Sequence, residues 1–179
     1  MLWNLDTTHA NVDFSVKHMA ISTVRGSFDL FSASGETDDA TGMPTKLSME
    51  IDAASVNTNN EQRDGHLKSA DFFETEKYPK ITFVSTKITG TPAELTITGD
   101  LTIRGVTKPV VLTGELSPVM KDPWGLQRRS LEVAGKLKRS EFGLTWNQAL
   151  EMGGVLVSDE VKLTVSAQAV AAAEAEATA

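Results

Sequence analysis

The side chains best suited to chemistry lie close together in a polar stretch, residues 57–79. Arg63, Asp64 and His66 fall within four positions of one another there. Arginine and histidine can bind an anion, and a histidine beside a carboxylate can transfer protons or ligate a metal. The chain has only three histidines and no cysteine, so a metal site would need His18 to join Asp64 and His66. An enzyme that uses His66, Asp64 and His18 is therefore one hypothesis.

The same stretch departs from the strand-like pattern of its neighbours. It begins with amide residues such as Asn59 that suit a helix N-cap, and Pro79 would stop any helix that follows. We expect a short helical segment around 59–73. Phe72 and Phe73 at its end would form a cover over an apolar surface. The more ordinary interpretation is that the two rings pack on the nearest part of the core.

Length and charge limit the classes of protein to consider. The 179 residues suffice for one domain with a sizeable core, which we place at 1–170, with 171–179 as a frayed tail. A net charge of −7 and a pI near 5.0 argue against nucleic-acid binding and against docking on an anionic membrane. No apolar run approaches the ~20 residues of a membrane span, so we expect no stable membrane insertion.

The first residues bear on the compartment. Residues 1–6 enter a strand-like pattern at once, without a basic segment or an apolar run of the kind that begins a signal peptide. As the sequence is written, we expect a cytoplasmic protein. A periplasmic or secreted location would follow if a leader has been cleaved.

Most of the chain alternates apolar and polar residues with the period of a β-strand. We interpret these stretches as roughly eight strands with turns at 6–9 and 34–44; the stretches are 3–5, 11–18, 24–30, 47–51, 81–84, 95–103, 110–116, 131–137 and 161–167. Closing such a sheet into a barrel removes its two edges, and a two-sheet sandwich is the alternative. Glycine recurs on the inward parities at Gly26, Gly99, Gly114 and Gly135, which suits bent strands around a partly empty lumen.

Five motifs, taken in order, resemble those of the YceI-like family, also called polyisoprenoid-binding, lipocalin-like proteins. They are Trp3, Asp6, His9, Phe14 and His18; residues 24–28; Asn59, Arg63, Asp64, His66, Leu67, Asp71, Phe72, Phe73, Tyr78, Pro79 and Phe83; residues 99–110; and Arg139, Phe142 and Gly143. The resemblance implies an all-β fold, an extended eight-stranded antiparallel lipocalin-like β-barrel with a small helical portion. It also implies a long lumen that binds the prenyl tail of an isoprenoid, such as a polyprenyl phosphate or an isoprenoid quinone.

The inward stripes would then supply the wall of a ligand tunnel. Our candidates are Phe14, Val16, Phe28, Met49, Phe83, Leu101, Ile103 and Leu137, with Phe72, Phe73, Phe142 and Trp146 at the rim. Methionine and phenylalanine suit a ligand with a bending, methyl-branched outline. The alternative is that these side chains fill the barrel, as in small closed barrels, which would make the protein a structural or interaction module.

A head group would need polar partners at one mouth. Arg63, His66 and Lys68 suit a phosphate, and Asn59, Asn60 and Tyr78 suit a quinone or a hydroxyl. Arg63 and Asp64 could instead hold the segment 57–79 against the strands. We favour a binding or carrier protein over an enzyme, with no catalytic residue, no metal and no cofactor beyond a bound isoprenoid lipid. Its role would be transport, storage or stress protection, and a homodimer would be unsurprising.

Overall fold

Long stretches of alternating apolar and polar residues form β-strands that pair into one antiparallel sheet. The computed structural model describes residues 1–173. Eight strands form the wall of a closed barrel, because the last of them pairs with the first, and the expected fold is confirmed. The wall strands are β1 (Leu2–His18), β3 (Phe31–Thr37), β4 (Pro44–Asp52), β6 (Lys80–Thr91), β7 (Glu94–Ile103), β8 (Val106–Leu116), β10 (Gln127–Lys138) and β11 (Val157–Ala171).

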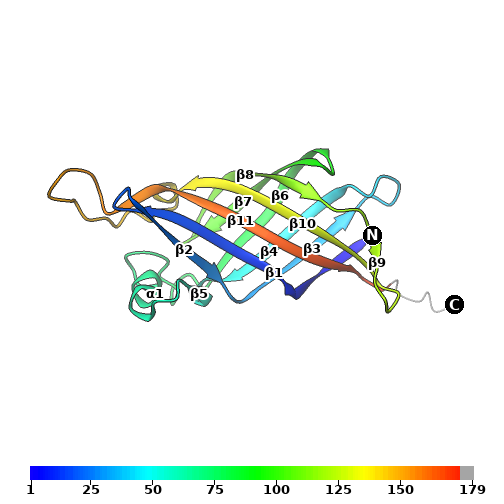
Figure 1. Cartoon of the computed structure of the whole chain (residues 1–179), viewed down its shortest axis with the longest axis horizontal. Coiled ribbons are helices and arrows are strands. Elements are labelled where there is room, and N and C mark those ends of the chain that lie inside the picture. The colour runs from blue at the N-terminus through cyan, green and yellow to red at the C-terminus, as the bar shows by residue number, and fades with distance from the viewer. Residues whose placement is uncertain (174–179) are drawn as a thin grey trace.

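Shorter elements lie at the two ends of the barrel. They are β2 (Ser22–Phe28), β5 (Val56–Asn57), β9 (Met120–Lys121), the helix α1 (Glu61–Lys68) and the 3₁₀ helices η1 (Ala53–Ser55) and η2 (Arg139–Phe142). Figure 1 shows α1, β5 and β2 on one side toward one end, and β9 with the N-terminus at the other. We refer to these as the α1 end and the β9 end.

The first strand holds the barrel together along both of its edges. One edge of β1 pairs with β11 from Trp3 to His18. The other edge is divided, because Leu2–Asn4 pairs with β3 whereas Val12–His18 pairs with β2. The wall therefore forks along β1, and β2 leads from this fork through β5 to α1.

Two expectations about the first forty residues are wrong. The predicted turn at 6–9 is an irregularity inside β1, where the register with β11 shifts between Asp6 and Ala10. The Asp6 carboxylate accepts hydrogen bonds from the backbone N–H and the hydroxyl of Thr8, at 3.1 and 2.7 Å, so the extra residues are held within the strand. Residues 34–37, assigned to a turn, belong to β3.

The expected helical segment is confirmed, but its first residue is wrong by one. Asn60, not Asn59, is the N-cap, and its side chain accepts a hydrogen bond from the Arg63 N–H at 3.0 Å. Asn59 instead takes a left-handed backbone conformation, with φ of 57°. The helix ends at Lys68, and turns carry the chain on through Phe72 and Phe73.

The buried side chains form two clusters along the barrel. One lies toward the α1 end and includes Phe28, Phe72, Leu137 and Phe142, and the other, toward the β9 end, centres on Leu95 and Ile97. At the C-terminal side, β11 extends to Ala171, one residue into the predicted tail, while 174–179 lie outside the described residues. No helix within 1–173 has the length and apolarity needed to cross a membrane.

Candidate functional site

The barrel encloses a cavity of about 410 Å³ that is lined almost entirely by apolar side chains. Its lining runs from Trp3 and Arg129 at the β9 end to His66 and Trp146 at the α1 end. Several side chains that point into the barrel, among them Met49, are only partly buried. Their exposed surface faces this cavity. The interior is therefore not filled by its own side chains, and its size is that of a small-molecule site.

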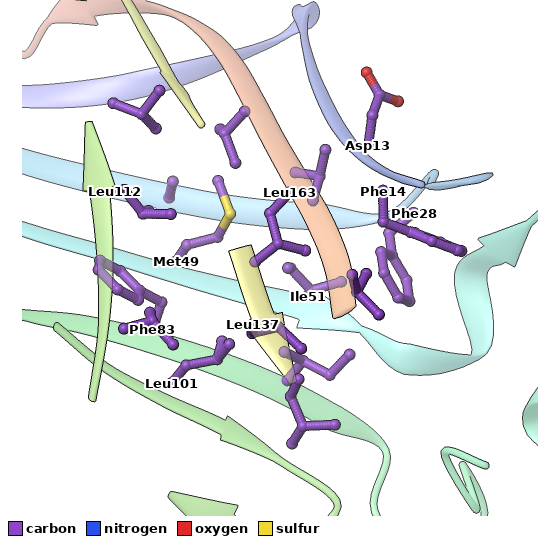
Figure 2. Close-up of a pocket in the computed structure, with 18 of the residues that line it drawn as sticks. Asp13, Phe14, Phe28, Met49, Ile51, Phe83, Leu101, Leu112, Leu137 and Leu163 are labelled. Carbon is purple, nitrogen blue, oxygen red and sulfur yellow. The ribbon is translucent and has the colours of Figure 1, made fainter. Parts of the chain in front are cut away.

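All eight predicted tunnel residues line this cavity: Phe14, Val16, Phe28, Met49, Phe83, Leu101, Ile103 and Leu137. Figure 2 shows Met49, Phe83, Leu101, Leu137 and Leu163 pointing from different strands into one space. The Asp13 carboxylate points away from that space, and partial burial raises its pKa. The wall of the cavity is consequently apolar along most of its length.

Two glycines allow large rings to lie flat against the wall. A Cβ atom on Gly26 would overlap the ring of Phe14, and one on Gly99 would overlap the ring of Phe83. Phe14 and Gly26 are direct cross-strand partners, so the ring covers the neighbouring strand. Because both rings occupy space that a side chain would otherwise take, they project less into the cavity. The predicted link between inward glycines and an open lumen thus has a local mechanism.

An aromatic cluster closes part of the α1 end. The ring centroid of His66 lies 5.0 Å from that of Phe72 and 4.7 Å from that of Trp146, both edge-to-face. Phe73 packs on Phe28 with centroids 5.7 Å apart. Of the four predicted rim residues, Phe72, Phe73 and Trp146 line the cavity.

The fourth predicted rim residue is placed elsewhere. Phe142 has 0% of its surface exposed and packs inside the cluster of buried side chains at the α1 end. It is not among the described residues that line the cavity. Its position on η2, immediately after β10, directs it into the core and away from the rim.

The six predicted head-group residues separate into two sets. Arg63 and His66 line the cavity, whereas Lys68, Asn59, Asn60 and Tyr78 are not among its described lining residues. Lys68, Asn59 and Asn60 are solvent-exposed, and the Tyr78 ring packs against Gly105. His66 Nε2 lies 2.8 Å from the Asp71 carboxylate, so this ring is held in place at the cavity edge.

The Arg63 guanidinium serves mainly to hold the segment. Its Nε donates to the Thr58 hydroxyl and its Nη2 to the Thr58 carbonyl, each at 2.8 Å. Asp64 accepts from the Thr58 N–H at 2.9 Å and from the Thr58 hydroxyl. We call Thr58, Arg63 and Asp64 the segment latch. Asp64 is turned toward Thr58 and His66 toward Asp71, so these two residues of the enzyme hypothesis have other partners, while His18 lines the cavity.

No cluster of three or more metal-ligating side chains is present within residues 1–173. The polar residues that do line the cavity include two arginines, Arg129 and Arg139, neither of which was predicted to contact a ligand. Arg129 is 9% exposed and Arg139 is 5% exposed, and burial lowers the pKa of both guanidinium groups. The signal that could have found Arg129 is its parity, because it continues the inward stripe of Leu131 and Val133 on β10.

Comparison with known proteins identifies the family. A model described as the YceI-like domain matches residues 3–169. The chain belongs to the YceI-like family. A UPF0312 protein of Staphylococcus aureus strain USA300 is 40% identical over 167 residues, which cover 93% of this chain and 95% of that protein.

Solved structures agree with this YceI-like assignment. The crystal structure of the Campylobacter jejuni YCEI protein matches with a TM-score of 0.77 and 36% identity, over 88% of this chain and 90% of that one. Burkholderia cenocepacia BcnA shares the fold, with a TM-score of 0.78 and 24% identity over 92% and 98% of the two chains. A polyisoprenoid binding domain from Saccharophagus degradans also shares the fold, with a TM-score of 0.66 and 19% identity over 95% of this chain and 98% of that one.

Proposed function

We propose that this YceI-like protein binds the prenyl tail of an isoprenoid lipid inside its barrel. The observation that carries the proposal is the hollow, apolar interior, whose lining comes from the wall strands and the aromatic cluster at the α1 end. A prenyl chain is nearly pure hydrocarbon, so its binding free energy scales with the area it buries. At about 0.8 kcal/mol per methylene-sized group, one buried isoprene unit contributes on the order of 3 kcal/mol.

These magnitudes make a few buried units sufficient. Association costs roughly 4–15 kcal/mol in lost translational and rotational freedom. Several isoprene units in the cavity exceed this cost without any hydrogen bond to the tail. The mixture of Met49 with Phe14 and Phe83 in the lining suits a methyl-branched chain, because methionine adapts its shape to irregular outlines.

The comparisons support the same class of ligand. The chain is YceI-like, and a protein of the same fold is described as a polyisoprenoid binding domain. At 19% identity that likeness concerns the fold, so the choice of a prenyl ligand rests on the cavity itself. In more detail, we propose that the cargo is a polyprenyl phosphate or an isoprenoid quinone. The protein would act in its transport or storage, or in stress protection.

The test is to extract the purified protein with organic solvent and identify its lipids by mass spectrometry. We expect a prenyl lipid in near-stoichiometric amount from the wild type. Ala33 faces the cavity on β3, whereas its neighbour Ser32 is exposed on the outer face. Ala33→Trp should fill part of the cavity and lower the lipid content several-fold, at a stability cost of about 1–3 kcal/mol.

Ser32→Trp is the matched control, since it adds the same side chain one residue away on the outside. Its lipid content should equal that of the wild type. Circular dichroism and thermal melting establish that both variants are folded. Repeated extracts of the wild type without any prenyl lipid, or a folded Ala33→Trp protein with undiminished lipid, would contradict the proposal.

A further inference from the structure

A buried arginine lies at the β9 end of the cavity, opposite the aromatic cluster. Arg129 has the inward parity of Leu131 and Val133 on β10, and 9% of its surface is exposed. Its guanidinium carbon lies 5.6 Å from the ring centroid of Trp3, which is 4% exposed and also lines the cavity. A positive charge therefore stands at one end of an otherwise apolar bore.

Within residues 1–173, only part of the hydrogen-bonding capacity of Arg129 is used. Nη1 donates to the Gly42 carbonyl at 2.7 Å, and Nε and Nη2 donate to the Ser117 carbonyl at 3.3 and 3.0 Å. A guanidinium has five N–H donors, so two are left over. Among residues 1–173 no carboxylate forms an ion pair with Arg129, and Glu36, which lines the same end, is exposed.

The arginine at the other end provides a comparison inside the same molecule. Arg139 donates to four carbonyls, of Leu144, Trp146, Val157 and Ser158, at 2.6–3.3 Å. The charge of Asp159 also acts on Arg139. Within residues 1–173, Arg139 thus uses four of its five N–H donors, one more than Arg129, and the charge of Asp159 favours its ionised form. Arg129 is about as deeply buried, yet among the described residues two of its donors and its charge find no partner, which a folded protein retains only at a cost.

We propose that Arg129 binds the anionic oxygens of an amphiphile, of the carboxylate class, whose hydrocarbon chain lies along the bore. The planar fork of a guanidinium matches the two oxygens of a carboxylate, and a single cation balances a monoanion. A dianionic phosphate would leave one charge uncompensated in this apolar surrounding, so the charge at Arg129 favours a carboxylate over the polyprenyl phosphate named above. The proposal rests on the proposed function, since the bore must first accept the hydrocarbon chain. It places the polar end of the ligand at the β9 end.

The experiment compares two ligands with the same fifteen-carbon prenyl chain, farnesoic acid and its methyl ester, on lipid-free protein at pH 8. Calorimetry or displacement of a fluorescent lipid gives the two dissociation constants. We expect the wild type to bind the acid about 10- to 100-fold more tightly than the ester, as a charge-assisted hydrogen bond would give. Arg129→Met should reduce the ratio of the two affinities to about one, while Arg129→Lys should restore part of the preference for the acid.

Arg128→Met is the matched control, because Arg128 is the adjacent arginine on the outer face of β10, where it pairs with Asp6 and Asp122. It should leave the ratio of acid to ester unchanged. A wild-type protein that binds the ester but does not prefer the acid overturns the proposal and leaves the proposed function intact. The same holds for an Arg129→Met protein that retains the preference. If neither ligand binds the wild type, the proposed function itself fails.

Discussion

Two glycines make room for aromatic rings that line the bore. The rings of Phe14 and Phe83 lie where Cβ atoms of Gly26 and Gly99 would otherwise be. An inward glycine under an aromatic ring thus has two effects: the ring covers backbone that would be bare, and its outer edge is withdrawn from the centre of the barrel. At this scale the size of the cavity depends on positions that carry no side chain.

Gly99→Ala tests this relation. The new methyl group overlaps the Phe83 ring and the Val84 carbonyl, so the ring must swing into the bore. We expect a loss of about 1–3 kcal/mol in the free energy of unfolding, together with weaker binding of a prenyl ligand. Urea denaturation and ligand titration measure the two effects.

A second glycine provides the control for Gly99→Ala. Gly65 lies in α1, and among residues 1–173 no atom beyond its chain neighbours and the helix backbone lies within 4 Å of the place a Cβ would take. Gly65→Ala should be neutral or should stabilise the protein by up to about 1 kcal/mol, as expected in a helix. Unchanged ligand binding by a stable Gly99→Ala protein would show that the ring position does not limit the bore.

At the residue scale, parity predicted the wall well and polar residues poorly. The eight tunnel residues follow from simple alternation, since in a closed barrel every second side chain faces inward. The same alternation places Arg129 inside. A pattern search based on hydropathy stops at a charged residue, however, so it does not extend the apolar stripe of β10 to Arg129. Arg63 donates two hydrogen bonds to Thr58, and no pattern in the sequence indicates this pairing.

Among the elements, the segment from β5 to β6 is held by contacts of two kinds. The segment latch ties α1 to Thr58, directly after β5, and the aromatic cluster and the Glu74–Arg104 ion pair join the segment to the barrel. The helix α1 has no fully buried residue of its own, so its amphipathic packing contributes little. Its N-cap and the bonds among Thr58, Arg63 and Asp64 therefore determine where it lies. Of the two rings predicted to form a cover, Phe72 is buried in the core cluster and Phe73 is partly buried against Phe28.

Arg63→Met should loosen this segment without unfolding the barrel. Removing two charge-assisted hydrogen bonds to Thr58 should raise amide hydrogen exchange in residues 57–79 by about tenfold or more. Exchange in β7 and β8 should stay as in the wild type. Hydrogen exchange followed by mass spectrometry resolves the two regions. Lys68→Met, at an exposed position of the same helix, serves as the control and should leave both regions unchanged.

The irregularity in β1 depends on one carboxylate. The Asp6 carboxylate accepts a hydrogen bond from the Thr8 hydroxyl and another, at 2.8 Å, from Arg128 Nη1. Arg128 Nε in turn donates to Asp122 at 2.7 Å. The hydrogen bonds from Thr8, His9 and Arg128 hold the pKa of Asp6 far below its ordinary value. Since the folded state favours the ionised carboxylate, Asp6 stabilises the fold above the unfolded pKa of about 4 and loses this effect as the pH falls below it.

Asp6→Asn should consequently lower the melting temperature at pH 7. The difference from the wild type should shrink as the pH falls from 5 toward 2, because the unfolded carboxylate takes up a proton first. Thermal melts followed by circular dichroism across this range measure the difference. A gap between the two proteins that stays constant with pH would mean that the charge of Asp6 has no part in holding the irregularity.

The elements that sequence patterns missed share a physical reason. β3 is built largely from Ser, Ala, Gly and Thr, whose small side chains give almost no alternation in hydropathy. The run Asp6 to His9 has the composition of a turn, yet local hydrogen bonds to the Asp6 side chain let it continue as a strand. The strands with clear alternation, such as β7, were predicted at nearly their full length.

In the whole molecule, the two buried clusters lie along a barrel whose centre they do not fill. Leu95 and Ile97 pack toward the β9 end, Phe28 and Phe142 toward the α1 end, and the cavity extends between. Apolar burial in the walls thus supports the fold while the middle is left for a ligand. A hydrocarbon that occupies this space would add its own buried area to the stability of the fold, by mass action.

The pairing of β1 with β11 also affects how the protein folds during its synthesis. Residues 19–156 separate these two neighbouring strands, so the barrel wall cannot close until nearly all of its sequence has been synthesised. Until then β1 has an unpaired edge that another chain could join. Loop closure over such a distance is slow, so a newly made chain passes through an open sheet that is prone to aggregate.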